Sequence, residues 1–269
     1  MWCAIRGNKL NSRFKLLTLA TAITVIVGGL TACKPRNEPV IDEQAPQQAV
    51  VESVIPTIQA KVVVESVPSP KVCDATGCME YRIQTVDTNI DWINDYFKDR
   101  IKALEPNAFK IQELEKVEFA DPAKAGLSQS STVVRYISQF GNIATFAIDS
   151  YSYMSGAAHG MYHTEYVNFD LKNKKRLSFE DIVLKGHERK VLDQLYASNS
   201  IWLENHVIER GKLQLSDNFY YGVNGIVFVY PLYELASYSE GMSELTLSYR
   251  KAKPLFNPQF MPSLPKYSQ

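Results

Sequence analysis

The first 32 residues constrain this chain most, because they have the pattern of a targeting segment rather than that of a folded domain. Arg6, Lys9, Arg13 and Lys15 give a positively charged start, and the apolar run LLTLATAITVIVGGL follows. This run is shorter than the roughly 20 apolar residues that a membrane-spanning helix needs. We therefore interpret residues 1–32 as a signal peptide and expect the fold further along the chain.

The apolar run ends in Leu30, Thr31, Ala32 and Cys33, which resemble a bacterial lipobox. In a lipobox, signal peptidase leaves the cysteine as the new N-terminus and its thiol carries diacylglycerol. The alternatives are an uncleaved anchor or an ordinary signal peptide. The resemblance implies lipidation at Cys33 and a lipid-anchored protein in the cell envelope. Lys34 follows in place of aspartate, which in a Gram-negative host favours the outer membrane, facing the periplasm.

The cysteine content fits export. Besides Cys3 in the signal and Cys33, the chain has only Cys73 and Cys78, in the segment CDATGC. Two thiols are too few for a zinc site, which takes four ligands, and the spacing differs from that of a thioredoxin-type pair. In an oxidising compartment this pair predicts a small disulfide loop.

The charge balance gives no electrostatic basis for binding nucleic acid, because the 29 Lys and Arg residues are balanced by 29 Asp and Glu residues. Residues 1–32 contain four basic residues and no acidic one, so the mature chain keeps 25 basic against 29 acidic residues. A mildly acidic chain suits a basic partner.

Composition divides the mature chain into a tether and a folded region. Residues 33–72 contain no aromatic residue and many Pro, Gln and Glu, which predicts a disordered tether after the lipidated cysteine. We expect an N-terminal sub-domain at 73–150, a C-terminal domain at 151–258 and a tail at 259–269.

Hydrophobic periodicity predicts both helices and strands. Residues 88–104 place Ile93, Phe97 and Ile101 on one helical face. Alternating segments on both sides of residues 141–142 predict a β-hairpin. The order of elements predicts an α+β fold, a mostly antiparallel sheet with helices packed on it, in two related sub-domains.

The segment GAAHGMYHTEY contains the most suggestive polar residues. His159 and His163 are four residues apart, with Glu165 close behind. On a helix this spacing could bind zinc, but the glycines and the β-rich run place it on a loop that enters a strand. We therefore predict no metal site, and no feature calls for a cofactor.

No catalytic motif is present, because G-x-S-x-G, P-loop and H-E-x-x-H patterns are all missing from the sequence. Asp170, Glu165 and Glu234 could form a glycosidase-like carboxylate pair. Asp170 ends a predicted strand, however, where carboxylates accept hydrogen bonds from turn N–H groups. The sequence therefore favours a binding protein over an enzyme. A hydrolase of wall polysaccharide using His159 with Asp170 or Glu165 stays as an alternative.

The tyrosines, 15 in all, cluster in and around two segments. Tyrosine offers area and a hydroxyl together, which suits contacts with sugars and proteins, whereas ordinary sheet packing is the alternative. The candidate binding face consists of His159, Tyr162, Glu165, Tyr166, Tyr233 and Tyr238.

Two blocks of sequence resemble the extracytoplasmic domain of RsiV-like proteins. The first has small residues before Ala-His, a strand that ends in aromatic-Asp, and a Leu-Ser helix start. The second has a glycine before an apolar strand, then Pro-x-Tyr-Glu and Tyr-x-x-Gly. The residues that match are Gly156, Ala157, Ala158, His159, Phe169, Asp170, Leu177, Ser178, Gly225, Phe228, Pro231, Tyr233, Glu234, Tyr238 and Gly241. Of these, we expect Gly156, Asp170, Pro231 and Gly241 to be structural.

This family is a domain of unknown function found in a lysozyme-binding anti-sigma factor, beside peptidoglycan deacetylase domains and in bacterial lipoproteins. The resemblance implies a non-catalytic envelope lipoprotein that binds a wall-associated ligand. A lysozyme-type muramidase is the most specific candidate for this ligand, and binding it would make the protein a sensor or inhibitor. A peptidoglycan-binding accessory lipoprotein is the alternative. Nothing resembles a sigma-binding segment or a deacetylase domain, so those roles do not carry over.

Overall fold

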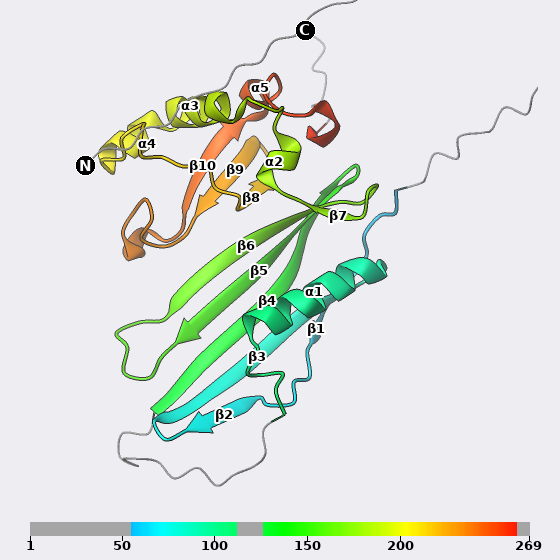
Figure 1. The fold of residues 1–269 in the computed structure, drawn as a ribbon, viewed down its shortest axis with the longest axis vertical. Coiled ribbons are helices and arrows are strands. Elements are labelled where there is room, and N and C mark those ends of the chain that lie inside the picture. The colour runs from blue at the N-terminus through cyan, green and yellow to red at the C-terminus, as the bar shows by residue number, and fades with distance from the viewer. Residues whose placement is uncertain (1–54, 112–125, 263–269) are drawn as a thin grey trace, which may run out of the picture. The chain divides into compact units, whose positions relative to one another are not determined.

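The larger of two sheets contains seven strands, in the order β1-β3-β4-β5-β6-β7 with β2 paired to β3 (Figure 1). All pairs are antiparallel except β3 with β4, which run parallel. The strands are β1 (Ala60–Val64), β2 (Lys71–Asp74), β3 (Gly77–Thr88), β4 (Gly126–Phe140), β5 (Ile143–Tyr153), β6 (Met161–Asp170) and β7 (Lys175–Leu177). The computed structural model describes residues 55–111 and 126–262, which fall in one unit, Val51–Gln269. Cys33 and the predicted signal peptide lie outside these ranges.

One helix, α1 (Asp91–Leu104), lies across this sheet (Figure 1). Ile93, Phe97 and Ile101 are buried, as the helical spacing predicts. The ring of Phe97 lies 5.0 Å from that of Phe146 in β5 and 5.8 Å from that of Phe169 in β6. The helix therefore closes a first hydrophobic core against the middle of the sheet.

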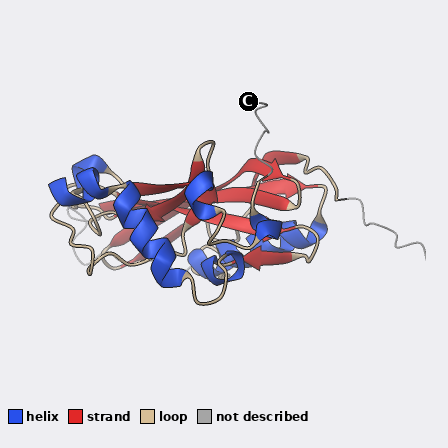
Figure 2. Ribbon diagram, turned by 90° about the horizontal axis from the view of Figure 1, so that it is seen from above, coloured by secondary structure: helices blue, strands red, loops and turns tan. Residues whose placement is uncertain are grey.

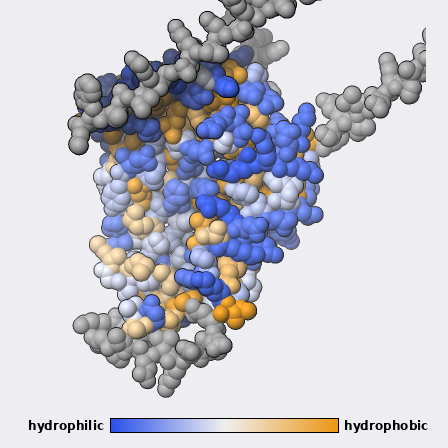
Figure 3. All heavy atoms as spheres, viewed as in Figure 1, coloured by the Kyte–Doolittle hydropathy of each residue, from blue (hydrophilic) through white to orange (hydrophobic). Residues whose placement is uncertain are grey.

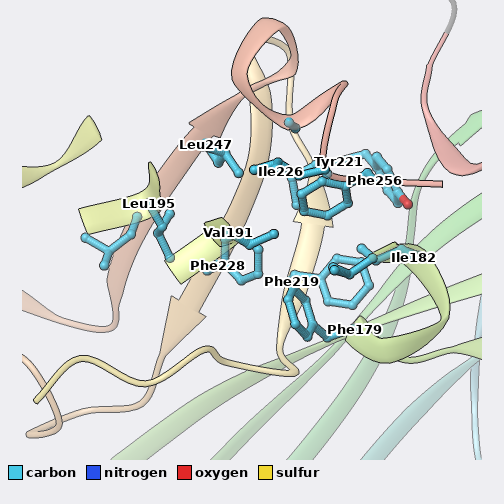
Figure 4. Close-up of a cluster of buried hydrophobic side chains, with 14 of the residues drawn as sticks. Phe179, Ile182, Val191, Leu195, Phe219, Tyr221, Ile226, Phe228, Leu247 and Phe256 are labelled. Carbon is cyan, nitrogen blue, oxygen red and sulfur yellow. The ribbon is translucent and has the colours of Figure 1, made fainter. Parts of the chain in front are cut away.

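The smaller sheet has the order β10-β9-β8. Seen from above, helices lie against the strands (Figure 2). The remaining elements are α2 (Phe179–Ile182), α3 (Glu188–Ser198), α4 (Ser200–Asn205), β8 (Phe219–Tyr221), β9 (Gly225–Tyr230), η1 (Tyr238–Glu240), β10 (Ser243–Ser248), α5 (Tyr249–Ala252) and η2 (Pro258–Phe260). Figure 4 shows Ile182 of α2 and Val191 of α3 directed toward Phe219 and Phe228, which form the centre of a second core.

Side-chain amides connect the two sheets. The backbone N–H of Tyr166 donates to Asn218 Oδ1 at 2.7 Å, and Asn218 Nδ2 donates to the Thr164 carbonyl at 2.8 Å. Asn168 Nδ2 donates to the Phe219 carbonyl at 2.7 Å. The two bonds of Asn218 engage a backbone N–H and a backbone carbonyl on the edge of β6, where β7 does not pair with it.

The structure confirms the α+β class, the largely antiparallel sheets and the disulfide between Cys73 and Cys78, which joins β2 to β3. The hairpin around residues 141–142 is present as β4 and β5. Ser178 and Asp181 form a capping box at the start of α2. Within the described ranges, no helix has the length and apolar character to cross a membrane.

Two predicted boundaries differ from the structure. Residues 60–64 of the predicted tether form β1, which pairs with β3, and Ile58 just before it is buried. The prolines that interrupt this stretch argued against a strand. The strand forms because β3, which lies further along the chain, pairs with it. The division at 150 is also wrong as a structural boundary, because β5 runs through it and the large sheet continues to Leu177. The boundary between the two parts of the fold therefore follows the strand pairing of the large sheet and not the composition of the sequence.

Candidate functional site

An exposed group of rings, the aromatic patch, gathers where the loop between β5 and β6 meets the segment after β9. It consists of Tyr151 from β5, His159 from the loop, Tyr162 from β6, and Tyr233 and Tyr238 from the later segment. Tyr151 and Tyr162 are direct cross-strand neighbours, so both rings stand on the same face of the sheet. Both remain about 40% exposed.

Tyr238 lies at the centre of the aromatic patch. Its ring stacks on His159 with centroids 4.0 Å apart, and it meets the edge of Tyr162 at 6.1 Å and the ring of Tyr233 at 5.7 Å. Its hydroxyl donates to the Gly160 carbonyl at 2.8 Å. This bond and these ring contacts hold the loop against the later segment, so the patch is assembled before any ligand arrives.

His159 has a hydrogen-bond partner on each side of its ring. Nδ1 lies 3.0 Å from the Gly160 carbonyl, which can only accept, so Nδ1 carries the proton. Nε2 lies 3.4 Å from the Tyr233 hydroxyl, which can donate to it. The imidazole therefore serves to align Tyr233 and Tyr238.

Two glycines make this arrangement possible. A Cβ on Gly160 would lie 2.3 Å from the Tyr151 hydroxyl oxygen, and a Cβ on Gly241 would lie 2.8 Å from the Tyr162 hydroxyl oxygen. Gly241 also has φ +83°, a left-handed conformation that favours glycine. Gly241, predicted as structural, thus lets Tyr162 approach the later segment.

Tyr233 is the most exposed tyrosine of the patch, with 56% of its surface accessible. Its backbone adopts φ 68°, a left-handed conformation that is costly for a bulky residue. Such conformations cost on the order of 1–3 kcal/mol and cluster at functional sites. Core packing does not explain this cost, because the ring points to solvent.

Two residues of the predicted binding face lie elsewhere. Glu165 accepts from Arg100 Nη2 of α1 at 2.6 Å, which places its side chain on the opposite face of β6. Tyr166 stacks on Tyr220 with centroids 4.4 Å apart, and burial raises the pKa of its hydroxyl. Strand alternation separates Glu165 from the rings, and the smaller sheet covers Tyr166.

Asp170 is fully buried at the end of β6. Its carboxylate accepts from the N–H groups of Lys172 and Asn173 and from the side-chain amides of Asn142 and Asn173, at 2.6–3.2 Å. Four hydrogen bonds engage both oxygens in holding the turn. Among the other residues predicted as structural, Gly156 has φ +85° in the exposed loop, and Pro231 is exposed after β9.

The alternative catalytic set does not assemble. Asp170 and His159 lie at opposite ends of β6, whose ten residues at about 3.3 Å each separate them by about 30 Å. Glu165 faces α1 rather than His159. In the parts of the chain that the structure describes, no group of three or more His, Cys, Asp and Glu could hold a metal ion.

A pocket of about 380 Å³ opens beside the aromatic patch. Sequence reasoning missed it, because its lining comes from the end of α1, from β4, β5 and β6, and from the segment after β9, which only the tertiary structure brings together. The face seen in Figure 3 mixes hydrophilic side chains with small apolar groups. The lining residues are Leu104, Glu105, Ser130, Ser150, Tyr151, Ser152, Met161, Tyr162, His163, Pro231 and Leu232.

Comparison with known proteins identifies a domain match and a shared fold. Residues 170–250 match the family model of DUF3298, described as a protein of unknown function. No curated protein matches this chain. A similar solved structure is a DUF3298 family protein from Pseudomonas aeruginosa PAO1, with a TM-score of 0.56 and 16% identity, covering 78% of this chain and 99% of that one. Another is a DUF3298 family member from Bacteroides fragilis NCTC 9343, with a TM-score of 0.48 and 16% identity, covering 75% and 93%. The chain thus matches a domain of unknown function over residues 170–250 and shares its fold with the Pseudomonas protein.

Proposed function

We propose that this chain is a cell-envelope lipoprotein, anchored through Cys33 in the outer membrane and facing the periplasm, whose aromatic patch binds a lysozyme-type muramidase. The observation that carries the proposal is the aromatic patch itself. Its rings come from segments far apart in the chain and are held together around the half-buried Tyr238, and the other four rings remain exposed. Clustered exposed rings indicate a surface that contacts a partner.

The composition of the surroundings supports a protein partner. Met154 and Met161 are exposed beside the tyrosines, and aromatic residues with methionine are enriched at protein interfaces. Tyrosine loses little conformational entropy on binding and adds a hydroxyl contact. The mildly acidic mature chain suits a basic muramidase, so electrostatic steering would speed association at low salt.

The test is calorimetric titration of residues 51–269 with a c-type lysozyme at low and moderate salt. We expect micromolar or tighter binding that weakens as salt rises, because screening reduces attraction between opposite charges. The variant Tyr233→Ala should weaken binding at least about tenfold, as loss of an exposed anchor ring at an interface does.

The matched control is Val223→Ala, which trims another highly exposed apolar residue in the turn between β8 and β9. It should bind like the unaltered chain. Absence of heat, together with an unchanged melting temperature, would remove the muramidase from the proposal. Sedimentation with purified sacculi would then test the alternative, a peptidoglycan-binding accessory lipoprotein.

A further inference from the structure

We infer that the pocket beside the aromatic patch is a carbohydrate-binding site, and that its ligand is a neutral oligosaccharide of N-acetylated amino sugars. The inference rests on the pocket's own lining and requires no protein ligand. It gives the alternative to the muramidase, a peptidoglycan-binding lipoprotein, a site and a ligand class.

The pocket exists because α1 is shorter than the strands beneath it. Its 14 residues span roughly 21 Å, whereas the 15 residues of β4 span about 50 Å. The helix ends at Leu104, and the strands continue beyond it. The same face of the sheet that packs under α1 is thus open at this end, where it presents Ser130, Ser150 and His163.

The polar groups in the pocket match the needs of sugar hydroxyls, which donate and accept at once. Glu105 Oε1 accepts from Ser130 Oγ at 2.6 Å and from Thr132 Oγ1 at 3.0 Å, which fixes the carboxylate at the rim. Within the described ranges, no hydrogen bond engages Glu105 Oε2 or the ring nitrogens of His163. The hydroxyls of Ser150 and Ser152 add further donors and acceptors.

The apolar part of the lining specifies the kind of sugar. Leu104, Met161 and Leu232 line the same pocket. Apolar side chains suit the methyl of an acetamido group. The volume of about 380 Å³ lies within the range of roughly 300–1,000 Å³ of small-ligand pockets.

The charges in the pocket favour a neutral ligand over an anionic one. Glu105 is the acidic residue of the lining, and the described lining contains no lysine or arginine. Phosphate and carboxylate groups are recognised by such cations, above all by arginine. A neutral sugar is therefore a better fit than a phosphorylated or acidic one.

The experiment is calorimetric titration of residues 51–269 with tetra-N-acetylchitotetraose and with cellotetraose, which has the same linkage without acetamido groups. We expect the acetylated sugar to bind at least tenfold more tightly than cellotetraose. His163→Ala should weaken that binding at least fivefold, with the melting temperature unchanged because His163 is exposed. Ser150→Ala is a second variant that should weaken binding independently.

The matched control is His187→Ala, a histidine before α3 outside the pocket, which should leave sugar affinity unchanged. Absence of binding, equal binding of both sugars, or full affinity in the His163 and Ser150 variants would overturn the inference. The outcome is separate from the muramidase test, because no lysozyme is present and Tyr233→Ala should keep its sugar affinity.

Discussion

Single polar residues hold β6, the strand that carries Tyr162 of the aromatic patch. Asp170 binds both N–H groups of its turn and two asparagine side chains. Asn218 bridges Thr164 and Tyr166 at the edge of β6. Because buried polar groups are costly when they lose a partner, the buried Asp170 fixes the C-terminal end of β6, and the half-buried Asn218 holds its middle.

Asp170→Ala should lower the free energy of unfolding by roughly 2 to 4 kcal/mol, because the four hydrogen bonds that its buried carboxylate accepts are lost at once. Urea denaturation of residues 51–269 measures this change. Asp95→Ala, at an exposed position of α1, is the control and should stay within about 0.5 kcal/mol. An Asp170→Ala variant as stable as the control would mean that the turn does not need this carboxylate.

At the scale of elements, one ion pair ties α4 to the segment that carries two patch tyrosines. His206, at the end of α4, stacks on Trp202 with centroids 3.9 Å apart. Its Nδ1 lies 2.8 Å from the Trp202 carbonyl, and its Nε2 lies 2.6 Å from Glu240 Oε2 in η1. Both partners are acceptors, so the geometry suits the doubly protonated imidazolium. Glu240 follows Tyr238 by two residues, which links this pair to the patch.

The two pKa shifts define the pH window in which this pair stabilises the fold. The Trp202 carbonyl and the Glu240 carboxylate raise the pKa of His206, so its contribution is complete below about pH 6.5 and is lost as pH rises through the raised value. Hydrogen bonds from His206 and Ser237 lower the pKa of Glu240, so its contribution is present above about pH 4.3 and is lost in acid. The pair stabilises most between these limits.

Glu240→Gln should therefore lower the melting temperature more at pH 5.5 than at pH 8.5. Proton titration followed by NMR should also show a lower pKa for His206 in this variant. Glu204→Gln, an exposed change on α4, serves as the control and should alter neither quantity. An equal loss of melting temperature at both pH values would contradict an ionised pair.

At the scale of the whole molecule, the segment before the disulfide is part of the large sheet. β1 pairs with β3 over five residues and Ile58 is buried, while Ser69 donates to the Ala108 carbonyl through its N–H at 3.0 Å. Without β1, the edge of β3 would lose its partner over the five residues from Gln84 to Thr88. The folded unit thus begins well before Cys73.

A chain of residues 70–269 should be less stable than one of residues 51–269 by at least about 2 kcal/mol, the free energy of burying one isoleucine side chain. Urea midpoints of the two chains measure the difference. A chain of residues 55–269 keeps β1 and Ile58 and should match the longer one. Equal midpoints for all three chains would show that β1 adds nothing to the sheet.

Local features of this protein were predictable from sequence because they depend on neighbours in the chain. The buried face of α1, the hairpin at residues 141–142, the capping box at Ser178 and the disulfide at Cys73 all involve residues close in sequence. Periodicity, turn residues and cysteine spacing encode such contacts directly.

Only the tertiary structure decided which predicted residues share a surface. Tyr238 bonds to Gly160 across 78 residues, and the register of β5 with β6 sets Tyr151 beside Tyr162 while turning Glu165 to the other face. A shift of one residue would reverse those faces, and no local pattern reports the register of distant strands. The sequence by itself determined the elements and their chemistry, whereas long-range pairing determined the aromatic patch and its pocket.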